Sequence, residues 1–284
     1  MQAILFLRIK RLYPEYIFAM LLCALMTNLF SHHISMNTFM LNVVMMAGWG
    51  GIPNIINGIW YVTVLFWGGC FLFNILALYK EKAECLIIPL ITLLCLFYLV
   101  NHSGTLTGNQ LGIEFNLLSK GTIRGILGLT VGIYTFQICK KCTAIRINNE
   151  KLINAIMTLL EFVSCFLLIK SICFRQGQDI SDFNVYFYIS YIIGLLYFKK
   201  EKLLKFLSFN FWGYVSDLSY TIYLTHLIVL EILRVHWPAL STMNPITMYT
   251  IVTILCILFG KICYELQKVV FQKLNKLFFL GNNE

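Results

Sequence analysis

Long apolar runs separated by short polar segments dominate the chain. Eight runs are long enough, or nearly so, for helices that cross about 30 Å of hydrocarbon at about 1.5 Å per residue. These runs are residues 14–31, 58–78, 85–100, 121–138, 152–173, 184–198, 217–236 and 245–264. The stretch that follows, 265–280, places lysines among apolar residues, which predicts an amphipathic helix on the cytoplasmic membrane face.

Composition strengthens this interpretation. The chain has 284 residues, of which 59% are hydrophobic and 12% charged, whereas soluble domains carry about 25% charged residues. We predict an all-α, polytopic membrane helix bundle that forms one domain over residues 1–284, surrounded by membrane lipid.

Basic residues set the predicted orientation. With the N-terminus in the cytoplasm, most of the 22 Lys and Arg residues fall in cytoplasmic segments or helix ends. The exceptions are Lys120, Arg124, Lys170, Arg175 and Arg234. We therefore expect a multi-pass protein of the inner (cytoplasmic) membrane with both termini inside. The net charge of +9 then reflects topology, and no nucleic-acid partner is expected.

The ten cysteines predict neither a disulfide framework nor a metal site. Most lie inside apolar runs, where Cys behaves as a small hydrophobic residue. Cys139 and Cys142 form a lone CxxC pair, and a metal site needs further ligands that the neighbouring sequence does not supply. We expect no bound cofactor.

Ionisable residues inside apolar runs are costly and therefore draw attention to function. Glu161 lies deep in the run 152–173 and requires a polar partner, whereas Lys170 can extend toward the surface. Glu231 and Arg234 are three residues apart and can pair on one helix face. Alternatively, these four residues form a polar path through the membrane.

One face of the run 217–236 presents hydroxyl groups and an imidazole. Tyr223 and His226 are three residues apart, and Tyr220 lies one turn earlier. The stripe is either a polar surface for helix packing or the wall of a cavity that binds a polar substrate. His32 and His33, in a long apolar outer segment, are weaker candidates for a general base.

Two further segments carry candidate binding residues. Asn57, Trp60 and Tyr61 open the second run, where aromatic side chains also mark a membrane interface. Arg8 and Arg11 share a helix face, and guanidinium groups suit phosphate oxygens. The arginines are either a topology signal or a site for a phosphorylated ligand such as coenzyme A.

Several stretches resemble the motifs of one family. They are Arg8-x-x-Arg11-Leu-Tyr-Pro14-x-Tyr16, Asn57-Gly-Ile-Trp60-Tyr61-Val-Thr-Val-Leu65-Phe-Trp67, Lys120-Gly-Thr-Ile-Arg124-Gly, Leu218-Ser-Tyr220-Thr-Ile-Tyr223-Leu-Thr-His226 and Glu265. Their order and the predicted topology resemble the membrane acyltransferase 3 family, which includes many bacterial O-acetyltransferases. The resemblance covers nearly all of the chain.

The resemblance implies an activity and a set of roles. Members of the family pass an acyl group, usually acetyl from acetyl-CoA, to a hydroxyl of a cell-surface polysaccharide or lipid-linked glycan. Arg8 and Arg11 would bind the phosphates of the donor, acetyl-CoA. Asn57, Trp60, Tyr61 and Glu161 would line the substrate cavity.

The chain also departs from the family pattern. The first family helix carries an arginine and, three turns later, a histidine that acts as the catalytic base, and no histidine precedes His32 here. The arginine-rich motif normally precedes the third family helix. We therefore expect the first two family helices and their histidine to be missing. His226, Tyr220 and Tyr223 are then the candidate catalytic residues.

Three interpretations follow from the sequence. The first is a membrane O-acyltransferase, or an inactive truncated copy of one. The second is a transporter or flippase of lipid-linked sugars, in which the intramembrane charges form the path. The third is a structural membrane subunit.

Overall fold

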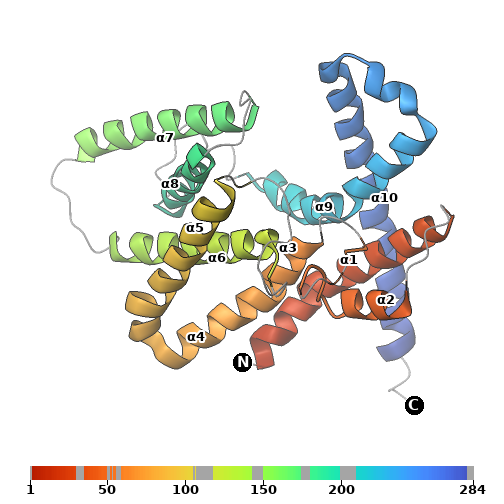
Figure 1. Ribbon diagram of the computed structural model, residues 1–284, viewed down its shortest axis with the longest axis horizontal. Coiled ribbons are helices and arrows are strands. Elements are labelled where there is room, and N and C mark those ends of the chain that lie inside the picture. The colour runs from red at the N-terminus through yellow and green to blue at the C-terminus, as the bar shows by residue number, and fades with distance from the viewer. Residues whose placement is uncertain are drawn as a thin grey trace. The chain divides into compact units, whose positions relative to one another are not determined.

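The computed structural model is built from helices. It describes residues 2–29, 35–49, 52, 54–55, 59–104, 106, 118–142, 150–173, 180–198 and 209–279. Within these ranges every regular element is a helix, and β-pairing is limited to one isolated bridge between Trp49 and Leu118. The prediction of an all-α fold is confirmed (Figure 1).

The chain divides into two compact units. The first contains residues 1–48, 52–63 and 210–284, and the second contains residues 49–51 and 64–209. The prediction of a single domain stays a prediction.

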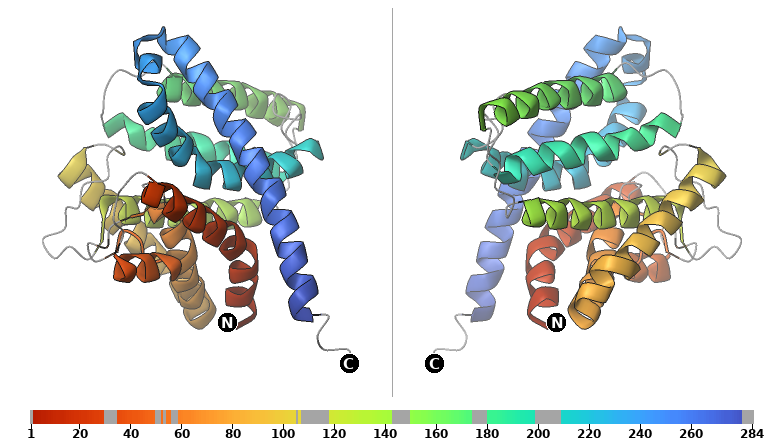
Figure 2. Two further views of the ribbon diagram at one scale, coloured as in Figure 1. Left: turned by 90° about the vertical axis from the view of Figure 1, so that its right-hand side faces the viewer. Right: turned by 90° about the vertical axis from the view of Figure 1, so that its left-hand side faces the viewer.

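The first unit is organised around α9 and α10. Its elements are α1 (Gln2–Leu29), α2 (Met36–Val43), α3 (Trp60–Thr63), α9 (Phe211–His236), the short 3-10 helix η5 (Pro238–Thr242) and α10 (Pro245–Phe279). The turn at η5 folds α10 back against α9, and α1 packs against both helices (Figures 1 and 2). The sequence motifs on α1 and α9 therefore belong to the same unit.

A glycine permits the close approach of α9 and α10. A Cβ atom at Gly260 of α10 would lie 2.5 Å from Cγ1 and 3.1 Å from Cα of Ile222 on α9. Small residues at such crossings allow backbones to approach, which is a main source of helix association in membranes.

The second unit packs its helices in a chain of neighbours. Its elements are the π-helical turn η1 (Val64–Gly68), α4 (Gly69–Lys82), the π-helical turn η2 (Ala83–Ile87), α5 (Ile88–Ser103), α6 (Lys120–Cys142), α7 (Glu150–Cys173), the 3-10 helix η3 (Ile180–Phe183) and α8 (Asn184–Phe198). Helix α6 packs against α5 and α8, and α8 packs against α7. A Cβ at Gly125 of α6 would lie 2.7 Å from Val64, so this glycine also marks a close contact.

The helical stretch from Trp60 to His102 bends at one residue. Lys80 has φ 42° and ψ −115°, a backbone conformation that residues other than glycine rarely adopt. Helices α4 and α5 meet at an angle there (Figure 1). The bend falls between the predicted runs 58–78 and 85–100, so the two runs correspond to the two arms of one bent helical stretch.

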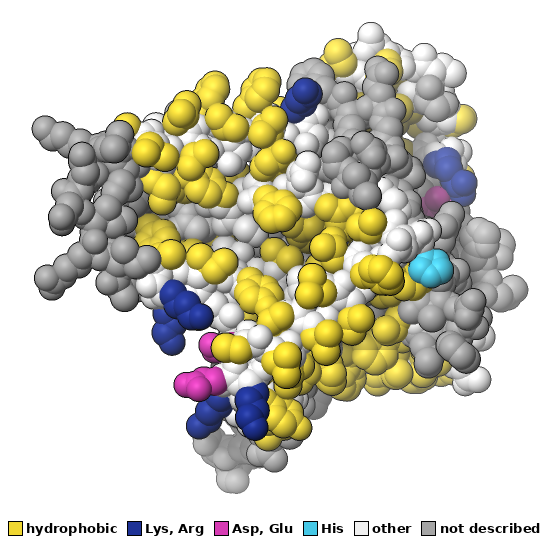
Figure 3. All heavy atoms as spheres, turned by 60° about the vertical axis from the view of Figure 1, so that its left-hand side comes forward, with side chains coloured by type: hydrophobic (Ala, Val, Ile, Leu, Met, Phe, Trp, Pro, Cys, Tyr) yellow, Lys and Arg dark blue, Asp and Glu magenta, His cyan; other side chains and the backbone are white. Residues whose placement is uncertain are grey.

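Five helical stretches are long and apolar enough to cross a membrane within the described ranges. They are Trp60–His102, Lys120–Cys142, Asn154–Ser171, Phe211–His236 and Pro245–Phe271. Helix α8 is apolar but shorter. Among the described residues, each of the eight predicted runs falls on a helix, although five helical stretches are both long enough and apolar enough to cross a membrane. Many large apolar side chains are exposed, and Figure 3 shows one face on which such side chains cover most of the coloured surface.

The C-terminal stretch is helical through Phe279, as the sequence predicts, but it is not a separate element. Residues Pro245–Phe279 form one continuous helix, α10, and the position of 265–280 on the membrane face stays a prediction. The apolar spacing continues past Glu265 without a Gly or Pro that would end the helix.

We expect substitution of Gly260 by Ala to destabilise the protein. The added methyl group must displace Ile222, and such overpacking costs about 1–3 kcal/mol. Gly213→Ala on α9 is the matched control, because a Cβ there meets nothing within 4 Å. Thermal unfolding of the detergent-purified variants measures the difference, and equal midpoints for the two variants would contradict the close crossing.

Candidate functional site

The arginine-rich segment and the tyrosine–histidine helix meet in the first unit. The hydroxyl of Tyr220 on α9 donates to the backbone carbonyl of Leu12 on α1 at 3.3 Å. Leu12 follows Arg11 directly, so the contact joins two motifs that lie far apart in the sequence. Arg8 and Arg11 both lie on α1, as the shared-face argument requires.

Two tyrosines of the same segment fix α1 to α2. The hydroxyl of Tyr16, which is fully buried, donates to the carbonyl of Asn42 at 2.5 Å, and the hydroxyl of Tyr13 donates to the carbonyl of Val43 at 2.8 Å. The Asn42 side chain accepts from the backbone N–H of Ile55 at 3.3 Å. This network holds the backbone just before position 57; Asn57 itself lies outside the described residues.

A polar cluster forms where α1, α9 and α10 meet. Glu15 of α1 is hydrogen-bonded to the side chain of Gln267 on α10 and interacts electrostatically with Arg11 and with Asp217 of α9. Gln267 is buried, and its Oε1 atom has no hydrogen-bond partner among the described residues. Buried polar atoms normally have hydrogen-bond partners, so the unpaired Gln267 Oε1 atom makes this cluster a candidate binding site.

A basic groove runs between α1 and α10 beside this cluster. Its volume is about 650 Å³, within the range of small-molecule sites. Lys10 and Lys268 bring positive charge to it, and Gln267 adds an amide. The remaining lining residues are Ile9, Tyr13, Pro14, Ile17 and Phe271. Arg8 and Arg11 lie on the same helix as Lys10 but are not part of the lining.

Aromatic rings connect the predicted cavity residues to the histidine. Trp60 and Tyr61 make an edge contact with centroids 5.9 Å apart, and Tyr61 makes another with Tyr223 at 5.9 Å. Tyr223 and His226 are also 5.9 Å apart. The structure thus brings Trp60, Tyr61, Tyr223 and His226 together within one unit, although they come from two distant sequence segments.

Hydrogen bonding fixes the tautomer of His226. Its Nδ1 atom lies 2.6 Å from the backbone carbonyl of Tyr223. A carbonyl oxygen can only accept, so Nδ1 carries the hydrogen and Nε2 keeps the lone pair. The residue is partly exposed. This arrangement suits a histidine that accepts a proton through Nε2.

The remaining candidate residues lie elsewhere. Glu161 belongs to α7 of the second unit, where it is fully buried and interacts electrostatically with Tyr191 of α8. Glu231 and Arg234 form an ion pair at 2.5 Å, with side chains 47% and 74% exposed. The predicted pairing on one helix face is confirmed, and this exposed pair lines no described groove.

Four residues of the site were not singled out from the sequence. Glu15 lies one turn beyond Arg11, and a carboxylate inside an apolar run was an available signal. From the sequence, Gln267 and Lys268 fall in the predicted amphipathic helix 265–280, and Lys10 is one of the basic residues that indicate a cytoplasmic N-terminus. Their role depends on the pairing of α1 with α10, which sequence spacing does not reveal.

The described residues contain no group of three or more His, Cys, Asp or Glu side chains that could hold a metal ion. Cys139 is buried and Cys142 exposed, each with a free thiol.

Comparison with known families now identifies the class. Residues 2–265 match the model of the acyltransferase 3 family, which is described as an acyltransferase domain. The chain belongs to this family, and the resemblance inferred from the motifs is confirmed. Membership indicates a multi-pass membrane protein with acyltransferase activity. Searches among curated proteins and among solved structures gave no match.

We expect Tyr220→Phe to loosen the junction of α1 and α9. The substitution removes the hydrogen bond to Leu12, which contributes about 0.5–1.5 kcal/mol. The unfolding midpoint should fall by about 2–4 °C per kcal/mol. Tyr249→Phe is the control, because Tyr249 is an exposed residue of α10. A midpoint that falls no further for Tyr220→Phe than for the control would argue against this link.

Proposed function

We propose that this protein is a membrane O-acyltransferase that moves an acetyl group from acetyl-CoA to a hydroxyl of a cell-surface or lipid-linked glycan. The observation that carries the proposal is the junction of the arginine-rich segment with the tyrosine–histidine helix through Tyr220 and Leu12. A donor-binding segment and a proton-accepting group then belong to one structural unit.

The donor is proposed to bind along α1. Coenzyme A carries several phosphate oxygens, and Arg8 and Arg11 supply guanidinium groups that bind such oxygens through paired hydrogen bonds. The groove beside them adds the ammonium groups of Lys10 and Lys268. Arg8 and Arg11 lie outside the groove lining but on the same helix as Lys10, so the proposed donor site combines the cleft and its two lysines with the arginines next to it along α1.

The proposed chemical step uses His226 as the proton acceptor. Nε2 takes the proton of the sugar hydroxyl, and the hydroxyl oxygen attacks the thioester carbonyl carbon. The tetrahedral oxyanion collapses, the carbon–sulfur bond breaks, and the coenzyme A thiolate takes the proton from the imidazolium. The Tyr223 carbonyl stabilises that imidazolium through Nδ1–H. The products are the acetyl ester and free coenzyme A.

Removal of either arginine tests the donor site. We expect Arg8→Gln and Arg11→Gln each to raise the Kd for coenzyme A by about 10–100-fold, the loss of one charge-assisted contact of about 1.5–3 kcal/mol. Arg234→Gln is the control, because that guanidinium pairs with Glu231. Equilibrium binding of labelled coenzyme A to the purified chain measures the change. Affinity that is unchanged in both variants would refute this donor site.

Removal of the imidazole tests the acyl-transfer step. We expect His226→Ala to lower transfer from labelled acetyl-CoA to a glycan acceptor by about 10²–10⁴-fold, as for loss of a general base. Binding of coenzyme A should be unchanged, because His226 is not among the residues that line the basic groove. His236→Ala at the exposed end of α9 is the control. Absence of transfer by the wild-type chain would contradict the proposed activity itself.

A further inference from the structure

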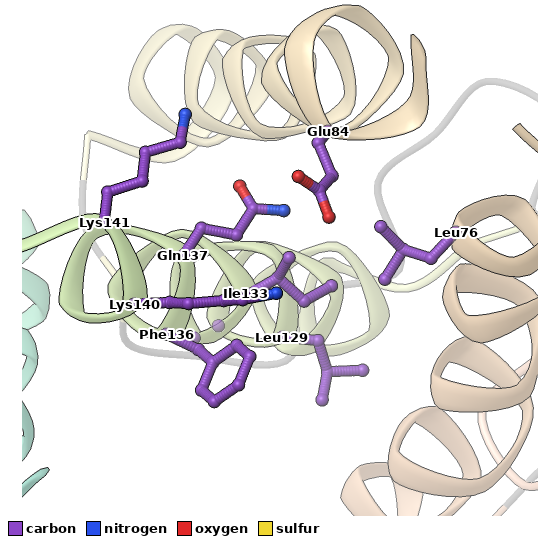
Figure 4. Close-up of a pocket in the computed structure, with 10 residues that line it drawn as sticks. Leu76, Glu84, Leu129, Ile133, Phe136, Gln137, Lys140 and Lys141 are labelled. Carbon is purple, nitrogen blue, oxygen red and sulfur yellow. The ribbon is translucent and has the colours of Figure 1, made fainter. Parts of the chain in front are cut away.

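A second groove lies in the other unit, between the segment α4–η2 and helix α6. Its volume is about 730 Å³, a size typical of small-molecule sites. It is separate in the sequence from every residue of the proposed acyl-transfer site. The lining residues are Leu76, Glu84, Gly128, Leu129, Gly132, Ile133, Phe136, Gln137, Lys140 and Lys141 (Figure 4).

Two glycines of α6 help to make this groove hollow. Gly128 and Gly132 are four residues apart, so they lie on one helix face and leave space where side chains would stand. A Cβ at Gly132 would meet nothing within 4 Å, and a Cβ at Gly128 would meet only Tyr186 at 3.7 Å. The space at Gly132 is therefore open rather than filled by a neighbouring helix.

Charged and polar groups gather at one end of the groove. Lys140 and Lys141 belong to the last turn of α6, and Glu84 projects from η2. Figure 4 shows the Gln137 amide and the Glu84 carboxylate pointing into the same gap, with Lys141 extending alongside. The end thus offers a carboxylate, two ammonium groups and an amide, all on exposed or partly exposed side chains.

The rest of the groove is apolar. Leu76, Leu129, Ile133 and Phe136 line it, and α6 is one of the helices long and apolar enough to cross a membrane. Lysines at the end of a membrane helix lie at the level of lipid head groups. The groove is therefore amphipathic along its length, with its charged end at the interface and its apolar part in the hydrocarbon.

We propose that this groove binds a phospholipid whose head group carries a primary amine, such as phosphatidylethanolamine. The ammonium groups of Lys140 and Lys141 match the lipid phosphate. The Glu84 carboxylate matches the lipid ammonium and opposes a purely anionic head group. One acyl chain lies over Gly128 and Gly132 against the apolar wall. The site is independent of acyl transfer and adds a lipid ligand to the second unit.

Native mass spectrometry of the full purified chain tests this proposal. The protein is incubated in detergent with equal amounts of phosphatidylethanolamine and phosphatidylglycerol, and the retained lipid is measured for each. The wild type should retain more phosphatidylethanolamine. Gly132→Leu should reduce its retention about fivefold, because a Cβ at this position meets nothing within 4 Å and the longer side chain would occupy groove space. Gly213→Leu, in an equally open position on α9, is the control for added apolar surface.

Glu84→Gln provides a second variant whose exposed position leaves folding unaffected. It should lower the preference for phosphatidylethanolamine over phosphatidylglycerol about fivefold, because the carboxylate partner is lost. Equal retention of phosphatidylethanolamine by the wild type and Gly132→Leu would overturn the site. A wild type that prefers phosphatidylglycerol, or an unchanged preference in Glu84→Gln, would overturn the choice of head group.

Discussion

A chain surrounded by hydrocarbon must satisfy its own polar groups, and that constraint explains most of this structure. Backbone groups are paired within helices, which is why the described residues show no strand. Side-chain hydroxyls follow the same rule. Thr92, Thr135, Thr158, Thr225 and Thr250 each donate to the carbonyl four residues earlier in their own helix. These hydroxyl groups are satisfied within their own helix, so their hydrogen bonds do not indicate contacts between helices or a functional site.

The polar residues that bond across helices are therefore the informative ones. Tyr220 reaches α1, Tyr16 reaches α2, and Glu15 reaches Gln267 on α10. These contacts need two helices in a fixed position, so they specify the arrangement of the first unit as well as stabilise it. Helix α1, which carries the proposed donor-binding arginines, takes part in all three contacts. The ion pair of Glu231 and Arg234, in contrast, joins two exposed residues of the same helix.

Sequence reasoning predicted the elements better than the site. Apolar runs longer than a soluble helix requires identify the helices, because the bilayer imposes their length. The motifs on α1 and α9 were found because their residue types are unusual in apolar runs. Lys10, Gln267 and Lys268 of the basic groove could not be predicted, because they line a common cleft only when α1 packs against α10. The same limit explains why α10 was divided in two: charge near a helix end has the same pattern whether the helix stops or continues.

The continuity of α10 has a mechanical consequence. A single rod carries both the tight crossing at Gly260 and, about 10 Å further along, the groove residues Gln267 and Lys268. Because Gly260 brings the backbones of α9 and α10 close together, a tilt of α10 about this crossing would displace both residues of the basic groove. If a molecule in the basic groove moves α10 rather than α1, it changes the angle at which α9 and α10 cross, and by linkage that angle then affects the binding free energy of the molecule equally.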